Sequence, residues 1–224
     1  MKFKLIRSGL IAALLALPVA AQAADLSTPS YKAPSYVAPS YATWSGFYVG
    51  LNAGYGFGTS RWDVPAMSIS TSGFVAGLTL GYNFQTGSWV WGVEGDADWS
   101  QIRGRAPCGT GTCEVRNDWL ATARARLGYG GFGSFLPYIT GGVAGGSVRA
   151  SNTNFLSATK TQIGYVIGAG VEYALLTNFS VKLEYLYADL GKFNCGDNCA
   201  GAGTAPNNVT FSTSLIRGGV NYRF

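Results

Sequence analysis

Apolar and polar side chains alternate with a period of two along most of the chain after Gly46. Between Gly46 and Gly56 the odd positions from Phe47 to Tyr55 are apolar, whereas the positions between them are Gly, Asn or Tyr. This period is typical of a β-strand with one apolar face. Similar segments predict eight strands, over residues 46–56, 73–84, 89–100, 116–129, 137–148, 163–173, 179–187 and 209–224.

The charged residues of these segments share the polar face. Glu94, Asp96 and Asp98 alternate with apolar residues in the third segment, and the fourth carries Arg116, Asp118, Arg124 and Arg126 on its polar side. We expect the three acids of the third strand to face Arg124 and Arg126, because cross-strand neighbours and diagonals lie within reach of long side chains. Further charges at Glu172, Lys182, Glu184, Arg217 and Arg223 extend the predicted network. The alternative is a hydrated wall of independent charges.

Two segments depart from the simple pattern. The glycine-rich stretch 137–148 has no clear facing. In the last segment Phe211 and Leu215 lie on the same parity as Arg217, so a β-bulge is expected there.

The polar segments between the strands alternate in length. Segments 57–72 and 101–115 are long, whereas 85–88 and 130–136 are short, and the alternation continues to the C-terminus. Long outer loops and short periplasmic turns are typical of outer-membrane barrels. The pattern therefore predicts that both termini are periplasmic.

Composition shows which solvent surrounds these strands. Only 12% of the 224 residues are charged, against about 25% in soluble domains. Residues 127–148 carry no charge and are long enough for a spanning helix, but they include eight glycines and Pro137, which argues against a helix. Hydrocarbon leaves only helices and closed barrels as spanning structures. We therefore predict an all-β protein, an eight-stranded antiparallel up-and-down transmembrane β-barrel.

The placement of aromatic residues separates this prediction from a soluble barrel or sandwich. Aromatic side chains gather at both ends of the apolar faces, as expected of two interfacial girdles. A soluble core would concentrate its bulk in the middle of the strands. The turn-side set is Phe47, Phe84, Trp89, Tyr129, Tyr173, Phe179, Tyr222 and Phe224, and the loop-side set is Tyr55, Phe74, Trp99, Trp119 and Tyr187.

The residues before the predicted barrel of residues 46–224 divide into two further segments. Residues 1–23 carry three basic residues, a short apolar run and an Ala21-Gln22-Ala23 site, which predicts a cleaved Sec signal peptide. Cleavage leaves 13 Lys and Arg against 11 Asp and Glu, a formal charge of +2, so no nucleic-acid partner is expected. Residues 24–45 hold three Pro-Ser-Tyr repeats and predict an extended periplasmic segment, either without contacts or touching peptidoglycan or a periplasmic partner.

Four cysteines form two close pairs, Cys108 with Cys113 and Cys195 with Cys199. Export to an oxidising compartment favours disulfides, and four cysteines permit three connectivities. A four-thiolate metal site is the competing interpretation, although neither pair has CxxC spacing. We expect local pairing, because the second and fourth loops should lie on opposite sides of the rim. No metal or cofactor is expected.

The segment Trp44-Ser-Gly-Phe-Tyr-Val-Gly-Leu-Asn-Ala-Gly-Tyr-Gly-Phe-Gly and the close Gly218-Gly-Val-Asn-Tyr-Arg-Phe224 resemble the alphaproteobacterial small outer-membrane proteins. These are opacity-type barrels related to the OmpA transmembrane domain. The resemblance implies an abundant surface barrel linked to envelope integrity, host contact or capture of a ligand such as haem. It also implies that the C-terminal Tyr222 and Phe224 form the assembly signal read by the outer-membrane insertion machinery. The chain departs from the family in its repeats and cysteine pairs, and it has no His to bind haem.

Three function classes follow. An enzyme is not expected, because outer-membrane hydrolases and acyltransferases generally use a His base and this chain has none. A small porin-like channel is the alternative, although eight strands leave room only for their own side chains. The preferred hypothesis is a structural surface protein of the cell outer membrane, in contact with its lipid and lipopolysaccharide, that contributes to envelope integrity and to adhesion or host contact through its outer loops.

Overall fold

Eight β-strands make up nearly all of the chain that the computed structural model describes, which is residues 43–63, 66–108, 111–152, 157–194 and 208–224. The predicted signal peptide, the Pro-Ser-Tyr repeats and the Cys195/Cys199 pair lie outside these ranges. Within them no helix is long and apolar enough to cross a membrane. The strands are β1 (Gly46–Trp62), β2 (Met67–Thr86), β3 (Trp89–Cys108), β4 (Gly111–Tyr129), β5 (Phe135–Asn152), β6 (Ala158–Ala174), β7 (Phe179–Asn194) and β8 (Asn208–Arg223).

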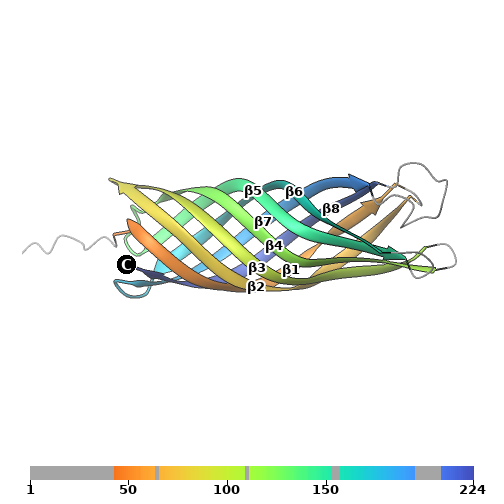
Figure 1. The fold of residues 1–224 in the computed structure, drawn as a ribbon. Coiled ribbons are helices and arrows are strands. Elements are labelled where there is room, and N and C mark those ends of the chain that lie inside the picture. Colours follow the sequence, from red (N-terminus) through yellow and green to blue (C-terminus); the bar gives the residue numbers. More distant parts are fainter. Residues whose placement is uncertain (1–42, 64–65, 109–110, 153–156, 195–207) are drawn as a thin grey trace, which may run out of the picture. The chain divides into compact units, whose positions relative to one another are not determined.

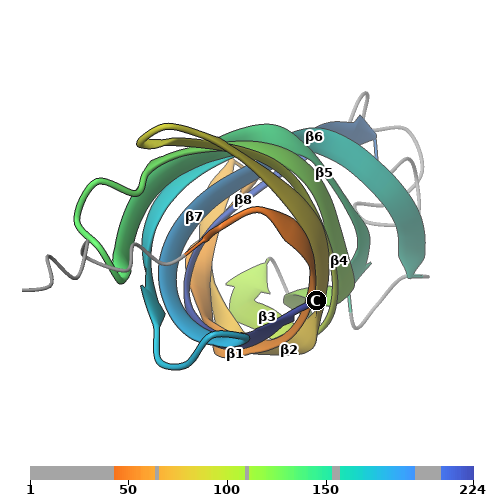
Figure 2. The same cartoon turned by 90° about the vertical axis from the view of Figure 1, so that its left-hand side faces the viewer.

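The strands form one closed antiparallel barrel. Each strand pairs with the next in sequence, and β8 pairs with β1 to complete the ring (Figures 1 and 2). The predicted fold class is thereby confirmed. The turn end holds the connections at residues 87–88, 130–134 and 175–178 and the C-terminus; the loop end holds those at 63–66, 109–110, 153–157 and 195–207.

In the half of the barrel nearer the turn end, apolar side chains point outward and polar side chains point inward. On β1 the outward Leu51 is 66% exposed, whereas its inward neighbour Asn52 is buried. Leu78 and Thr79 show the same contrast on β2. In water such an exterior would be unfavourable, but in hydrocarbon it needs no cover. This arrangement is the one that the alternation predicts.

The strands continue well past the predicted loop-side ends. Most of residues 57–72 and 101–115, expected to be loops, belong to β1, β2, β3 and β4. We call this extension the collar: residues 57–62, 67–72, 101–108, 111–118, 147–152, 158–161, 188–194 and 208–215. In the collar Ser68 and Ser70 point outward while Ile69 is buried between them. The sequence prediction missed these strands because it looked for apolar outward faces, and here the apolar face is inward.

Register irregularities set the facing of the collar. Shifts lie between Trp99 and Ile102 on β3 and between Asn117 and Leu120 on β4. They turn Arg116 and Asp118 outward, so the expectation that these two residues share the polar inner face with Arg124 is wrong. Arg116 is exposed and Asp118 is half-buried, and they pair with each other at 2.8 Å.

Candidate functional site

The ten charged residues predicted to line the lumen are all buried. They number five acids and five bases, so their formal charges balance: Glu94, Asp96, Asp98, Glu172 and Glu184 with Arg124, Arg126, Lys182, Arg217 and Arg223. Strands β3, β4, β6, β7 and β8 contribute them. Because buried charges are tolerated only when paired, their contacts decide whether the interior is stable.

Arg124 is the first centre of this interior cluster. Its guanidinium contacts Glu94, the residue directly opposite on β3, and it reaches Asp96 at 2.7 Å. On the far side it reaches Glu184 of β7 at 2.8 Å. One cation therefore joins three carboxylates across the lumen, and all three contacts are inaccessible to water.

Arg217 of β8 is the second centre. It contacts Asp96 at 2.9 Å, Asp98 at 2.8 Å and Glu184 at 2.8 Å. Asp98 was expected to face the arginines of β4, but in the described part of the chain its ion pair is with Arg217 instead. Arg217 therefore pairs both with Glu184, the residue directly opposite on β7, and with Asp96 and Asp98 of β3, so neighbours in the sheet are not its only partners.

Two further bases show the same preference for partners across the lumen. Arg126 pairs with Glu172 of β6 at 2.7 Å and lies 3.6 Å from Glu94. Lys182 of β7 sits directly opposite Glu172 in the sheet, yet its ammonium lies 3.0 Å from Glu94 of β3. The Lys182–Glu94 contact joins opposite walls of the eight-stranded barrel, whereas Arg126 reaches past β5 to Glu172.

Neutral side chains that were not predicted to belong to the network complete the cluster. The hydroxyl of Tyr48 donates to Glu94 at 2.7 Å, and the hydroxyl of Thr122 donates to Asp96 at 2.7 Å. Tyr138 donates to Glu184 at 3.2 Å and carries the Arg126 guanidinium 4.0 Å from its ring centroid. Tyr48 alternates with the apolar outward residues of β1, and this alternation was the one feature of the sequence that indicated its inward position. Tyr138 lies in the segment whose facing was ambiguous.

Trp44 covers the interior at the turn end, although the sequence division placed it before the barrel. The indole is fully buried against Val90 and Leu136, and its backbone N–H donates to Gln85 Oε1 at 2.8 Å. Arg223 lies 5.2 Å from the indole centroid and makes no ion pair in the described part of the chain. Its guanidinium instead donates to the carbonyl of Thr177 at 3.1 Å.

Apolar side chains fill the interior at the loop end. The cluster includes Trp62, Ile69, Ile102, Phe211 and Leu215, each of which is at most 3% exposed. Phe211 and Leu215 therefore face inward with Arg217, and the register of β8 against β1 is continuous across them. The expected bulge in the last strand is absent, because the inner wall itself changes from polar to apolar along the barrel axis. A shift occurs on β7 instead, between Asp189 and Lys192.

The predicted assembly signal lies at the turn end. Tyr222 and Phe224 are exposed on the outer wall, with ring centroids 5.1 Å apart, and Tyr222 also packs against Phe179. The backbone N–H of Phe224 donates to the carbonyl of Phe47. The C-terminal residue is thus joined to the first strand, and its role in assembly remains a prediction.

Cys113 of the collar is buried and disulfide-bonded. We expect peptide mass spectrometry of the unreduced protein to find Cys108 linked to Cys113 and Cys195 linked to Cys199, because the two cysteines of each pair are close in sequence. Cross-linked peptides between the two pairs, free thiols or bound zinc would contradict this. Such short loops should add at most about 3 kcal/mol to stability.

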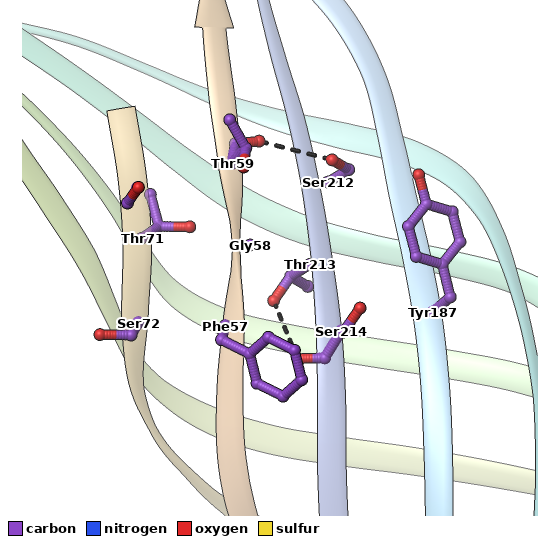
Figure 3. Close-up of a pocket in the computed structure, with 10 residues that line it drawn as sticks. Phe57, Gly58, Thr59, Thr71, Ser72, Tyr187, Ser212, Thr213 and Ser214 are labelled. Carbon is purple, nitrogen blue, oxygen red and sulfur yellow. Dashed lines mark hydrogen bonds between the residues drawn. The ribbon is translucent and has the colours of Figure 1, made fainter. Parts of the chain in front are cut away.

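The outer wall of the collar has a hollow of about 470 Å³ on β1, β2, β7 and β8. Serine and threonine side chains surround it, with Phe57 and Tyr187 at its edges (Figure 3). The Ser212 hydroxyl donates to the carbonyl of Thr59 at 3.4 Å. This part of the wall is therefore suited to water or to polar groups rather than to hydrocarbon.

Comparison with known proteins gives consistent matches. Residues 9–224 match the family described as outer membrane protein beta-barrel domain. The chain is 33% identical over 228 residues to the 31 kDa outer-membrane immunogenic protein of Brucella melitensis, covering 91% of this chain and 93% of that protein. It is 36% identical over 182 residues to the 25 kDa outer-membrane immunogenic protein of Brucella abortus, covering 81% and 80%.

A solved structure shares the fold. Neisserial surface protein A aligns with a TM-score of 0.50 at 19% identity, over 80% of this chain and 98% of that one. At this identity the likeness bears on the barrel architecture alone.

Proposed function

The chain belongs to the outer membrane protein beta-barrel family, and from this premise we propose that it is a sealed structural barrel that contributes to envelope integrity. The protein is located in the outer membrane, as its relatives are, which are named outer-membrane proteins. It is a surface protein of that membrane. We propose three further properties: the lumen is sealed, the protein contributes to envelope integrity, and it is not an enzyme.

The observation that carries the proposal is the filled lumen. Trp44 covers the turn end, the charged cluster around Arg124 and Arg217 crosses the middle, and the apolar cluster around Phe211 fills the loop end. The side chains of Arg124, Asp96, Glu184 and Arg217 have no exposed surface. Eight-stranded barrels enclose only enough space for their side chains. Such an interior leaves no continuous water path for a solute.

The same interior argues against an enzyme. Its carboxylates are held by arginines and hydroxyls, so they are neither free to act as bases nor open to a substrate. The chain also has no His. Host contact would be made by the loops. Much of their length, residues 109–110, 153–156 and 195–207, lies outside the described residues.

We expect the full protein, refolded into planar lipid bilayers, to show no steady conductance. A 16-stranded porin in the same lipid, whose lumen holds water, is the positive control. Folding is checked by electrophoresis, since a compact barrel migrates anomalously until it is heated. A large and steady conductance from folded protein would reject the sealed lumen and favour the channel.

A second arm of this test addresses the envelope. Cells lacking the protein should become sensitive to detergent, and restoring the unmodified gene should reverse this. Unchanged detergent resistance would reject the envelope role while leaving the sealed lumen standing.

A further inference from the structure

Three arginines form a row on the outer wall of the collar. Arg103 of β3 lies directly opposite Arg116 of β4, and Arg116 lies directly opposite Arg149 of β5. All three side chains are exposed and point away from the lumen, because their neighbours Ile102, Val115 and Val148 are buried inside. Like charges directly opposite each other destabilise a sheet. The row therefore has a cost that the barrel fold does not require.

Carboxylates offset only part of this charge. Asp118 pairs with Arg116 at 2.8 Å, and Glu114 pairs with Arg105 at 3.1 Å rather than with the row. Arg149 donates to the hydroxyl of Ser157 at 3.2 Å. Arg103 makes no ion pair within the part of the chain that the structure describes. An anion bound along the row would remove the repulsion.

Two of these strands, β3 and β4, share an apolar hollow with β1 and β2, nearer the turn end than the row. This cavity of about 490 Å³ is lined by Phe47 of β1, Leu80 and Tyr82 of β2, Val93 and Gly95 of β3 and, at its β4 edge, Ala123, which lies opposite Gly95. On the collar side of the cavity the facing residues are small: Ala97 lies opposite Ala121, and Ala121 lies opposite Gly145 of β5. In a bilayer this groove faces hydrocarbon chains.

The spacing of the two features matches half a membrane. Arg103 is eight residues beyond Gly95, and Arg116 seven beyond Ala123. At about 3.3 Å per residue and a tilt near 40°, this is roughly 18–20 Å along the barrel axis and roughly 15–17 Å around the wall, a sideways distance that a multiply acylated lipid can span. Half the hydrocarbon core is roughly 15 Å. If Gly95 lies at mid-membrane, the arginines lie at the level of the outer head groups, beyond the interfacial Trp99 and Trp119.

We propose that β3, β4 and β5 form a binding site for a phosphorylated, multiply acylated glycolipid of the lipopolysaccharide class. Its phosphate lies along Arg103, Arg116 and Arg149, where guanidinium groups form charge-assisted hydrogen bonds with phosphate oxygens. Its acyl chains lie in the groove over Gly95 and Ala123. The proposal rests on the outer-membrane placement of the barrel and is independent of whether the lumen conducts.

The test measures binding of bisphosphorylated lipid A to the full protein in detergent micelles by native mass spectrometry. The triple variant Arg103→Gln, Arg116→Gln, Arg149→Gln should weaken binding about tenfold or more. The matched control is Arg61→Gln, an exposed arginine at the loop end of β1 outside the row, which should change binding little. Equal binding by the triple variant and the unmodified protein would overturn the proposal.

A second variant tests the groove. Ala123→Leu should reduce binding of lipid A by filling the hollow, whereas Gly218→Leu, also outward but on β8, should not. Heat-modifiable migration confirms that each variant is folded. Normal lipid A binding by Ala123→Leu would reject the acyl part of the site.

Two further arms separate other occupants. Lipid A stripped of its phosphates should bind the unmodified protein as weakly as intact lipid A binds the triple variant. Inorganic phosphate at millimolar concentration should displace intact lipid A only slightly; full displacement would show a site for free anions and overturn the lipid proposal. Dimers that Ala123→Leu abolishes, seen by sedimentation without lipid, would instead identify the groove as an interface between copies.

Discussion

Arg124→Glu is expected to lower the free energy of unfolding by about 3–5 kcal/mol, the usual cost of leaving a buried charge without its partner. Arg124 holds Glu94, Asp96 and Glu184 together, and the substitution would place a fourth carboxylate among them. Equilibrium unfolding in urea, with the protein in lipid vesicles, provides the measurement.

A charge reversal and a surface control make this result specific. Adding Glu184→Arg to Arg124→Glu should recover part of the loss, because it restores one ion pair across the lumen, although the new arginine would face Arg217. Arg61→Glu, at an exposed position, should change stability by less than about 1 kcal/mol. Similar effects of Arg124→Glu and Arg61→Glu would mean that the interior charges are independent and hydrated.

Gly164→Val is expected to cost about 3 kcal/mol or more, and to reduce the amount of folded barrel that assembles. A Cβ at Gly164 would clash with the backbone carbonyl oxygen of Asp189. Asp189 precedes the register shift on β7, where Gly191 has a φ of 73°. A glycine in this conformation is typical of a bulge, which brings the β7 backbone close to β6.

The matched control is Gly218→Val on the outer wall of β8. The nearest atom to a Cβ there is the Lys182 carbonyl oxygen at 3.8 Å, so the change should stay within about 0.5 kcal/mol. The fraction of heat-modifiable protein in outer-membrane preparations compares the two variants. Equal fractions would show that β6 and β7 can separate enough to admit the side chain.

The membrane half of the barrel was predictable because one rule holds throughout it. Lipid outside and a polar lumen inside make every outward residue apolar, so Leu51 and Leu78 identify their strands directly. The charged positions followed from the same parity. All ten are buried in the structure, since any charge on a spanning strand that avoids lipid has to point inward.

The collar and the ion-pair partners were not predictable in this way. In the collar the solvent outside is water, so Ile69 and Phe211 point inward. A search for strands with an apolar outer face therefore assigns these residues to a loop or a bulge. The partners depend on lumen width. Alternation along β3 shows that Asp98 points inward, but it does not show that Arg217 reaches it from β8.

The reach of those ion pairs has a consequence for how the barrel assembles. Lys182 and Glu94 are 88 residues apart in sequence, and Arg217 and Asp98 are 119 apart, so neither pair can form in a partly built sheet. An open sheet of β1 to β6 in hydrocarbon would keep Arg124 beside Glu94 but would hold Asp98 without Arg217, its ion-pair partner among the described residues, at a cost of several kcal/mol. Folding intermediates that enter the bilayer before β8 meets β1 are therefore penalised, and ring closure and membrane insertion are expected to occur as one cooperative, all-or-none step.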